Sequence, residues 1–141
     1  MSDGLKELFG EPIYAYTRKQ AVEDGQQIDV SKIAQEAGLK FPVFVTSSVW
    51  DSLIVPHESL KGWQDAEGRL WDALWMLVVA IKQGKATGDM IKYKVYYQFP
   101  RKRYLCNEEP YITELVTLKA MVGTYDFDDP QPAITIMLPE E

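Results

Sequence analysis

Cysteine and histidine are nearly absent from this chain of 141 residues, which contains one of each, Cys106 and His57. A single cysteine excludes a disulfide within the chain and favours a reducing compartment, so we expect a cytoplasmic protein. Without a CxxC or HxxxH spacing, these two residues form no ordinary zinc site. His57, between Pro56 and Glu58, is best interpreted as an exposed loop imidazole. The alternative, a Cys106–His57 nucleophile pair, requires the two side chains to meet in space.

Long apolar runs and phosphate-binding glycine patterns are also missing. The longest nearly apolar segment, 70–81, has about a dozen residues, whereas a bilayer span needs roughly 20. The first seven residues lack the basic start and apolar run of a signal peptide. No Gly-x-Gly-x-x-Gly or Walker loop occurs, which argues against a standard nucleotide site. We therefore predict no cofactor, no metal and no membrane span.

The remaining composition is that of an ordinary globular protein with an acidic bias. Apolar residues make up 46% of the chain, charged residues 26% and aromatic residues 12%, and the net charge is −6. The length suits a single domain over residues 1–141, and the aromatic residues supply enough bulky surface for a core. The acidic balance disfavours nucleic acid as a partner on average, although a local patch can differ.

Helix start and stop signals fill the first half of the chain. Each expected helix begins at a capping residue and ends at glycine or before proline. The short helices are expected from Thr17 to Gly25, from Asp29 or Ser31 to Gly38, and from 46–48 to Pro56. A short buried strand is expected over Phe41–Thr46, because the segment is apolar and β-branched.

A long helix is predicted from Asp65 to Gly84. Its apolar side chains cover most of the circumference, which is typical of a helix buried by neighbours on several sides. Trp71, Leu74, Trp75 and Val78 are therefore predicted as core residues of this helix.

The pattern changes to strands after this helix. Alternation over 91–99 indicates a half-buried strand, and two further strands are expected over 112–122 and 133–138. Turn residues over 123–132 mark the second connection. Consecutive strands with moderate connections favour an antiparallel meander. We predict an α+β fold in which short N-terminal helices and one long buried helix pack on an antiparallel sheet of three or more strands.

Several segments together carry a resemblance to a known family. They include Ile13-Tyr14-Ala15-Tyr16-Thr17-Arg18, Asp24-Gly25, Asp29-Val30-Ser31, Ala37-Gly38, Lys40-Phe41-Pro42-Val43, Val49-Trp50, Gly68-Arg69-Leu70-Trp71-Asp72 and Ile134-Thr135-Ile136-Met137-Leu138-Pro139-Glu140. With these segments the chain resembles a family of small uncharacterised bacterial proteins, classed as a domain of unknown function and associated with plasmids, phages and other mobile elements. The resemblance implies a setting, a mobile element in a bacterial cytoplasm. It carries no catalytic residues.

An acidic cluster near the end of the chain partly matches the pattern of a calcium-binding loop. Asp126, Asp128 and Asp129 alternate with Tyr125 and Phe127. The glycine and the distal glutamate that a calcium loop needs are missing, so a solvated turn is the better interpretation.

Two segments are candidate binding surfaces. Tyr14, Tyr16 and Arg18 have the same parity in an expected strand, where they could recognise a planar or anionic ligand, or could form a half-buried edge strand. The second segment, Lys92–Tyr104, has five basic residues and no acidic one, and its candidate binding residues are Lys92, Lys94, Tyr96, Arg101, Lys102, Arg103 and Tyr104.

The basic segment has two interpretations. Lys92, Lys94 and Tyr96 are predicted to share one strand face, and 101–103 to form an exposed hairpin tip. Basic groups beside aromatic rings can bind single-stranded nucleic acid. Lysines can equally guard an edge strand, and the acidic residues that follow could pair with the basic ones within the chain or across a dimer.

The function predicted from sequence is a non-enzymatic accessory protein of a mobile element that binds another protein, or a second copy of itself. The alternative is a weak nucleic-acid binder that uses the segment Lys92–Tyr104. A small hydrolase is the third hypothesis.

Overall fold

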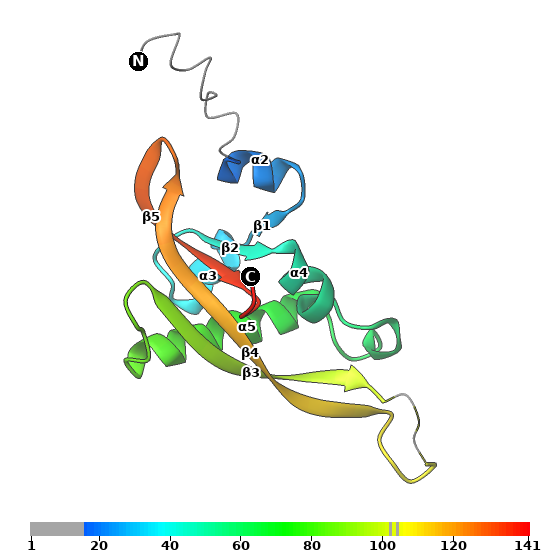
Figure 1. Ribbon diagram of the computed structural model, residues 1–141. Coiled ribbons are helices and arrows are strands. Elements are labelled where there is room, and N and C mark those ends of the chain that lie inside the picture. Colours follow the sequence, from blue (N-terminus) through cyan, green and yellow to red (C-terminus); the bar gives the residue numbers. More distant parts are fainter. Residues whose placement is uncertain (1–15, 102, 104) are drawn as a thin grey trace, which may run out of the picture.

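A computed structural model describes residues 16–101, 103 and 105–141 (Figure 1). Its strands form one five-stranded sheet in the order β1-β2-β5-β4-β3. The strands are β1 (Gln27–Asp29), β2 (Val43–Thr46), β3 (Met90–Pro100), β4 (Tyr111–Asp126) and β5 (Asp129–Met137). The helices are α2 (Arg18–Glu23), α3 (Ser31–Ala37), α4 (Ser47–Val49), the π-helix η2 (Trp50–Ile54), the 3-10 helix η3 (Glu58–Leu60) and α5 (Ala66–Lys82). None of these helices is both long and apolar enough to cross a bilayer.

The sheet is mixed, which corrects the prediction of a purely antiparallel one. Strands β3, β4 and β5 do form the expected antiparallel meander. Strand β2, however, pairs with β5 in parallel, in the register Val43↔Ile134 to Val45↔Ile136. The chain between β2 and β5 contains α5 and the β3–β4 hairpin, so it is long enough for the crossover that a parallel pair requires. The sequence pattern identified β2, β3, β4 and β5 without showing this partner, and it missed the short strand β1.

Strand β4 is longer than its predicted range of 112–122. Its first part pairs with β3 and its last part with β5, so the segment 119–121 has a partner on each side (Figure 1). The expected turn over 123–132 shrinks to residues 127–128. Pro130 and Pro132 lie inside β5, in a stretch that precedes its pairing with β2. Proline is tolerated there because the strand has a free edge at that point.

The helix boundaries follow the predicted signals closely. Thr17 caps α2 in a capping box with Gln20, and Asp65 caps α5 by accepting from the Gly68 N–H. Gly38 ends α3 with a φ of 109°, in the left-handed region that favours glycine. The third short helix begins at its predicted cap, Thr46, but winds into the π-helix η2 before Pro56.

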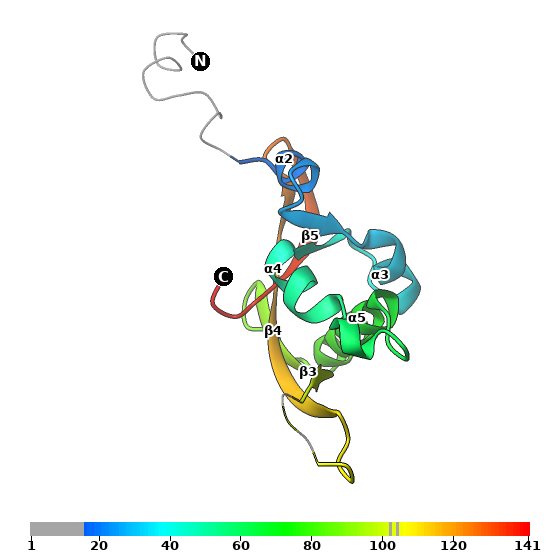
Figure 2. The same ribbon diagram turned by 90° about the vertical axis from the view of Figure 1, so that its right-hand side faces the viewer.

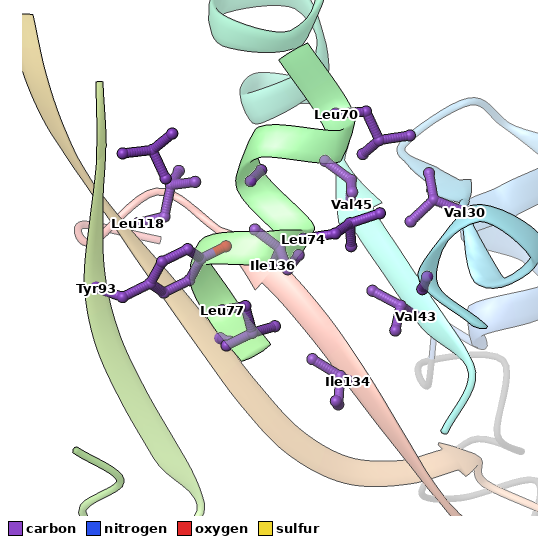
Figure 3. Packing of buried hydrophobic residues seen from close by; sticks show 14 of the residues in the cluster. Val30, Val43, Val45, Leu70, Leu74, Leu77, Tyr93, Leu118, Ile134 and Ile136 are labelled. Carbon is purple, nitrogen blue, oxygen red and sulfur yellow. The ribbon is translucent and has the colours of Figure 1, made fainter. Parts of the chain in front are cut away.

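The hydrophobic core lies between the sheet and helix α5 (Figure 3). Figures 1 and 2 show α5 and α3 on the same face of the sheet. In Figure 3 the α5 side chains point toward apolar residues of β2, β3, β4 and β5. The labelled members of the cluster are Val30, Val43, Val45, Leu70, Leu74, Leu77, Tyr93, Leu118, Ile134 and Ile136.

For two of the four residues of α5 that were predicted to be in the core, the prediction is wrong. Leu74 and Val78 are buried, whereas Trp71 is 38% exposed and Trp75 is 47% exposed. The two tryptophans are one residue farther around the helix than Leu70 and Leu74, and this turns them away from the sheet. Helix α5 is thus covered on its sheet-facing side, and its outer side keeps large aromatic rings in contact with solvent.

A buried arginine joins α5 to the end of β3. Arg69 is 5% exposed, and its guanidinium donates to the carbonyls of Leu53 and Gln98 at 2.6 and 3.0 Å. It also lies over the ring of Tyr97, 4.5 Å from the centroid, and burial lowers its pKa. The Tyr97 hydroxyl in turn donates to the Arg69 carbonyl at 2.7 Å. The network satisfies the buried cation with carbonyl dipoles, so no buried carboxylate is required.

Helix α2 is held by an acidic residue more than 100 positions away. Asp126 accepts hydrogen bonds from the backbone N–H groups of Arg18 and Lys19, each at 3.1 Å, and from that of Phe127 at 2.9 Å. Partial desolvation acts to raise its pKa, but the three N–H donors and the nearby Arg18 lower the pKa below its usual 3.8. The acidic cluster thus caps a helix as well as forming a turn.

We expect Leu74→Ala and Trp75→Ala to differ sharply in stability. The first substitution opens a cavity in the core and should cost about 2–5 kcal/mol of unfolding free energy. The second removes an exposed ring and should cost less than about 1 kcal/mol. Urea unfolding monitored by circular dichroism measures both, and similar losses for the two variants would contradict the outward position of Trp75.

Two neighbouring tyrosines offer a second matched pair. The Tyr93 hydroxyl is buried without a hydrogen-bond partner among the described residues. Tyr93→Phe should therefore leave thermal stability unchanged or raise it, since a buried unpaired polar group is removed. Tyr97→Phe deletes the hydrogen bond to Arg69 and should cost about 1 kcal/mol. Calorimetry of both variants measures these changes in thermal stability. A larger loss of stability for Tyr93→Phe than for Tyr97→Phe would show that the Tyr93 hydroxyl is hydrogen-bonded.

The cap on α2 predicts a pH dependence. Because the folded pKa of Asp126 is lowered from 3.8, its contribution is complete above that value and disappears as the pH falls through the folded pKa. Asp126→Asn should cost less than about 1 kcal/mol near neutral pH, because solvent screens the partly exposed carboxylate. Urea unfolding at about pH 6 and about pH 2.5 should show this difference shrinking at the lower pH. Asp128→Asn is the control, and an equal effect there would contradict the cap.

Candidate interaction surface

Helix α5 and strand β3 border a continuous depression, which we call the α5–β3 groove. It consists of two hollows of about 910 and 410 Å³ that share Tyr96 as a lining residue. The larger lies beside the start of α5 and the smaller beside its end. The α5 residues that line the groove include Gly68, Asp72, Met76 and Val79, followed by the C-cap residue Gln83, and those of β3 include Lys92, Lys94, Tyr96 and Gln98.

Helical spacing explains the α5 wall. Residues 68, 72, 76, 79 and 83 are separated by three or four positions, so they follow one side of the helix. Leu70, Leu74 and Leu77 lie on another side and enter the core. The groove therefore forms because α5 presents its leucines to the middle of the sheet and this second side to the edge strand.

Exposed aromatic residues gather along this groove. Trp63, Trp71 and Tyr96 line the larger hollow, and they are 55%, 38% and 67% exposed. Met76 and Leu115, which are 36% and 47% exposed, line the smaller one beside Tyr96. Large exposed apolar groups collected on one hollowed face are a mark of a binding surface.

The two ends of the groove carry opposite charges. The smaller hollow is lined by Lys85, Lys92 and Lys94 and by no acidic residue among those that the structure describes. The larger hollow contains Asp65, Glu67 and Asp72, as well as Lys61 and the buried Arg69. Burial raises the pKa of Asp72, although nearby Arg69 acts in the opposite direction. The groove thus offers a cationic end and a mainly acidic end, with Tyr96 between them.

The first part of the basic segment lies in this groove. Lys92, Lys94 and Tyr96 are all exposed on one face of β3, as the alternation predicts. Arg101 follows the strand, and its guanidinium donates to the Glu109 carbonyl and lies 3.5 Å from the Glu108 carboxylate. An acidic residue that follows the segment therefore pairs with Arg101 within the chain.

Of the remaining residues of the basic segment, the structure describes one, Arg103, which lies in the connection between β3 and β4. Arg103 is exposed, while Lys102 and Tyr104 fall outside the described residues. The structure thus brings Lys92, Lys94 and Tyr96 together, and it adds Lys85 to them, a residue that the sequence analysis left out. Its proximity depends on the turn between α5 and β3.

The other candidate surface is arranged differently from the expected strand. Arg18 is the first residue of α2, and Tyr16 donates to the Asp24 carboxylate at 2.7 Å. Tyr14 lies outside the described residues. Arg18 therefore does not continue a strand from Tyr16 as the shared parity assumed, because the capping box at Thr17 starts a helix here.

The contacts of Arg18 are structural. Its guanidinium lies 4.3 Å from the centroid of the Phe44 ring. It donates to the Gln27 side chain at 2.8 Å, to the Thr135 hydroxyl at 3.1 Å, and to the carbonyls of Thr124 and Tyr125. Burial lowers its pKa. This arginine joins α2 to four strands, which favours the structural interpretation over ligand recognition.

The isolated histidine and cysteine occupy exposed positions. The His57 Nδ1 accepts from the Ser59 N–H at 3.1 Å and so caps η3. Cys106 is a free, exposed thiol in the connection between β3 and β4. Over residues 16–101, 103 and 105–141, no group of three or more histidine, cysteine, aspartate or glutamate side chains is placed to hold a metal ion.

Sequence reasoning found one wall of the groove and missed the other. The alternation in β3 exposes Lys92, Lys94 and Tyr96, but the stripe on α5 was interpreted as uniformly buried. The signal that could have revealed it is the presence of polar residues, Asp72 and Gln83, within the apolar helix at helical spacing.

Comparison with known proteins gives the family and nothing on its activity. Searches of curated proteins and of solved structures found no match. A family model described as "Family of unknown function (DUF6573)" matches residues 8–141, so the chain belongs to this family of unknown function.

Proposed function

We propose that this chain is a non-enzymatic protein-interaction protein that binds a partner protein through the α5–β3 groove. The observation that carries the proposal is the concentration of exposed aromatic rings along this groove, with Trp63, Trp71 and Tyr96 all more than one third exposed. Such rings bring a large apolar area to an interface and lose little side-chain entropy on binding. Tryptophan and tyrosine are accordingly common among the residues that dominate binding energy.

The environment of these rings supports the same proposal. The ring of Trp63 lies 6.0 Å from that of Tyr111, so it is partly held in place before any partner arrives. Trp71 is fixed on a regular helix, in α5. Anchors that are already ordered reduce the entropic cost of association.

The proposed setting is that of an accessory protein of a bacterial mobile element, acting in the cytoplasm. The support for the setting is the resemblance of the segments around Thr17, Val43 and Gly68 to small proteins of plasmids and phages. The single cysteine, Cys106, fits a reducing compartment. The partner would then be a protein of the element or of its host.

Weak binding of single-stranded nucleic acid is the second candidate function. Lys85, Lys92 and Lys94 beside Tyr96 supply positive charge and a stacking ring, which favours it. The acidic residues in the adjoining hollow, the Arg101–Glu108 pair and the net charge of −6 oppose it. Fluorescence anisotropy with labelled oligonucleotides tests it, and we expect no binding at about 50 mM salt.

A photoreactive residue placed in the groove tests the proposed function. Tyr96 and Phe127 are 67% and 70% exposed on different hairpins, so they form a matched pair of sites. Benzoylphenylalanine at 96 should crosslink a distinct protein in extracts of the native cells, whereas the same group at 127 should not. Unmodified chain in excess should suppress the adduct, because specific binding saturates.

The groove proposal has clear contrary outcomes. Equal labelling from positions 96 and 127 would indicate nonspecific contact. Adducts with nucleic acid and none with protein would favour the second candidate. The adduct at 96 should also survive a rise to about 0.5 M salt, because salt screens charges and leaves apolar contacts in place.

A further inference from the structure

Strand β3 is an edge of the sheet, and its hydrogen bonds show which residues have backbone groups on the free side. Its eleven pairs with β4 run without a register shift, so successive residues alternate between facing β4 and facing away. Met90 exchanges both backbone hydrogen bonds with Thr87, at 2.7 and 3.1 Å, on the side away from β4. The Gln98 carbonyl also points away, since it accepts from Arg69 at 3.0 Å.

The backbone N–H and C=O groups of the even-numbered β3 residues therefore point away from β4, toward the free edge of the sheet. The flanking contacts agree, because the Asp89 carbonyl accepts from Val122 and the Arg101 N–H donates to Pro110, both on the β4 side. Between Met90 and Gln98, the outward positions are Lys92, Lys94 and Tyr96. Their N–H and C=O groups have no hydrogen-bond partner within the described part of the chain.

These open backbone groups form a slot with defined ends. The Thr87–Met90 bridge occupies one end, and Arg69 occupies the other at Gln98. The slot spans Lys92 to Tyr96, and at about 3.4 Å per residue it offers pairing to a strand of roughly five residues. The α5 wall of the groove, with Met76 and Val79, runs beside it.

We propose that the α5–β3 groove binds its partner by strand addition: an extended, acidic segment of another protein pairs with the backbone of Lys92, Lys94 and Tyr96. This rests on the proposed function and specifies its partner. Main-chain hydrogen bonds to an exposed edge supply the affinity in this mode, and pockets for alternate side chains supply the specificity. Here the slot provides the main-chain hydrogen-bonding groups, and the groove provides the pockets for side chains.

The charges select the chemistry of the added strand. Residues of an added strand that lie opposite Lys92 and Lys94 have their side chains on the same face as these lysines. Aspartate or glutamate fits there, with Lys85 close by, and an apolar residue fits opposite Tyr96. The alternate residues of the strand face the α5 side, where Met76 and Val79 favour apolar side chains.

The same lysines argue against a second copy of this chain as the occupant. Pairing of two β3 edges would bring the Lys92 and Lys94 side chains of both copies into one narrow surface, and like charges across adjacent strands destabilise the pair. Lysines on an edge strand commonly prevent such self-association. An acidic strand removes the repulsion, whereas a second β3 adds to it.

The backbone can be tested separately from the charge at one position. Lys94→Ala removes the charge and keeps the outward N–H, while Lys94→Pro removes both. Proline is tolerated at an edge position whose N–H does not point into the sheet. Random ten-residue peptides displayed on phage are first selected against the full chain, and the most enriched peptide is synthesised with a fluorescent label as the probe.

We expect the enriched peptides to alternate acidic and apolar residues and to lack proline. Lys94→Ala should weaken the labelled peptide by about two- to fivefold, as expected for an exposed ion pair. Lys94→Pro should weaken it by roughly tenfold or more, because backbone pairing is interrupted. Equal effects of the two variants would overturn strand addition, and so would enriched peptides that are basic or rich in proline, or no enrichment at all.

Hydrogen exchange on the unaltered chain provides a second measurement that does not depend on the folding of the proline variant. The peptide should slow exchange of the Lys92, Lys94 and Tyr96 amides, and unchanged exchange there would overturn the proposal. Sedimentation that shows a dimer dispersed by Lys94→Pro would make a second copy the occupant and also overturn it. A specific protein adduct at position 96 with equal Ala and Pro effects would leave the interaction function standing while strand addition fails.

Discussion

The parallel pairing of β2 with β5 is the constraint on which the rest of this structure depends. It joins the helical first half of the chain to the hairpins of the second half, through Val43 and Val45 beside Ile134 and Ile136. All four side chains are buried in the core. Because β5 is also fixed to β4, and β4 to β3, this one contact positions α3 and α5 over the sheet. The α5–β3 groove at the opposite edge is a consequence of that placement.

Local signals in the sequence were enough for most helices and strands, although β1 and η3 were missed, and they were insufficient to show which strands pair. Thr17, Gly38 and Asp65 predicted helix boundaries because caps depend on neighbouring backbone atoms. The parallel β2–β5 pair escaped prediction because it joins segments about 90 residues apart, and nothing in strand alternation identifies a distant partner. The role of Asp126 was missed for the same reason, since its hydrogen bonds to α2 form only after folding.

The candidate site was predictable in part. Period-two alternation correctly exposed Lys92, Lys94 and Tyr96, because one strand face must leave the core. The exposure of the tryptophans on α5 was not predictable in the same way. Trp71 and Trp75 belong to an apolar stripe too wide for one sheet face to cover, and hydrophobicity alone does not say which members are left outside. The depth of the groove depends on the angle between α5 and β3, which is a property of tertiary packing.

In strand β3, the odd-numbered residues stabilise the core and the even-numbered residues form the exposed surface. Ile91, Tyr93, Val95 and Tyr97 face the core, while the alternate residues turn their side chains away from the core and their backbone groups away from β4. Changes at Lys92, Lys94 or Tyr96 therefore have little to disturb in the fold. An evolving lineage could exchange one binding specificity for another by altering these three side chains, with the scaffold unchanged. The edge of this sheet is a place where recognition can diverge quickly while the domain beneath it stays the same.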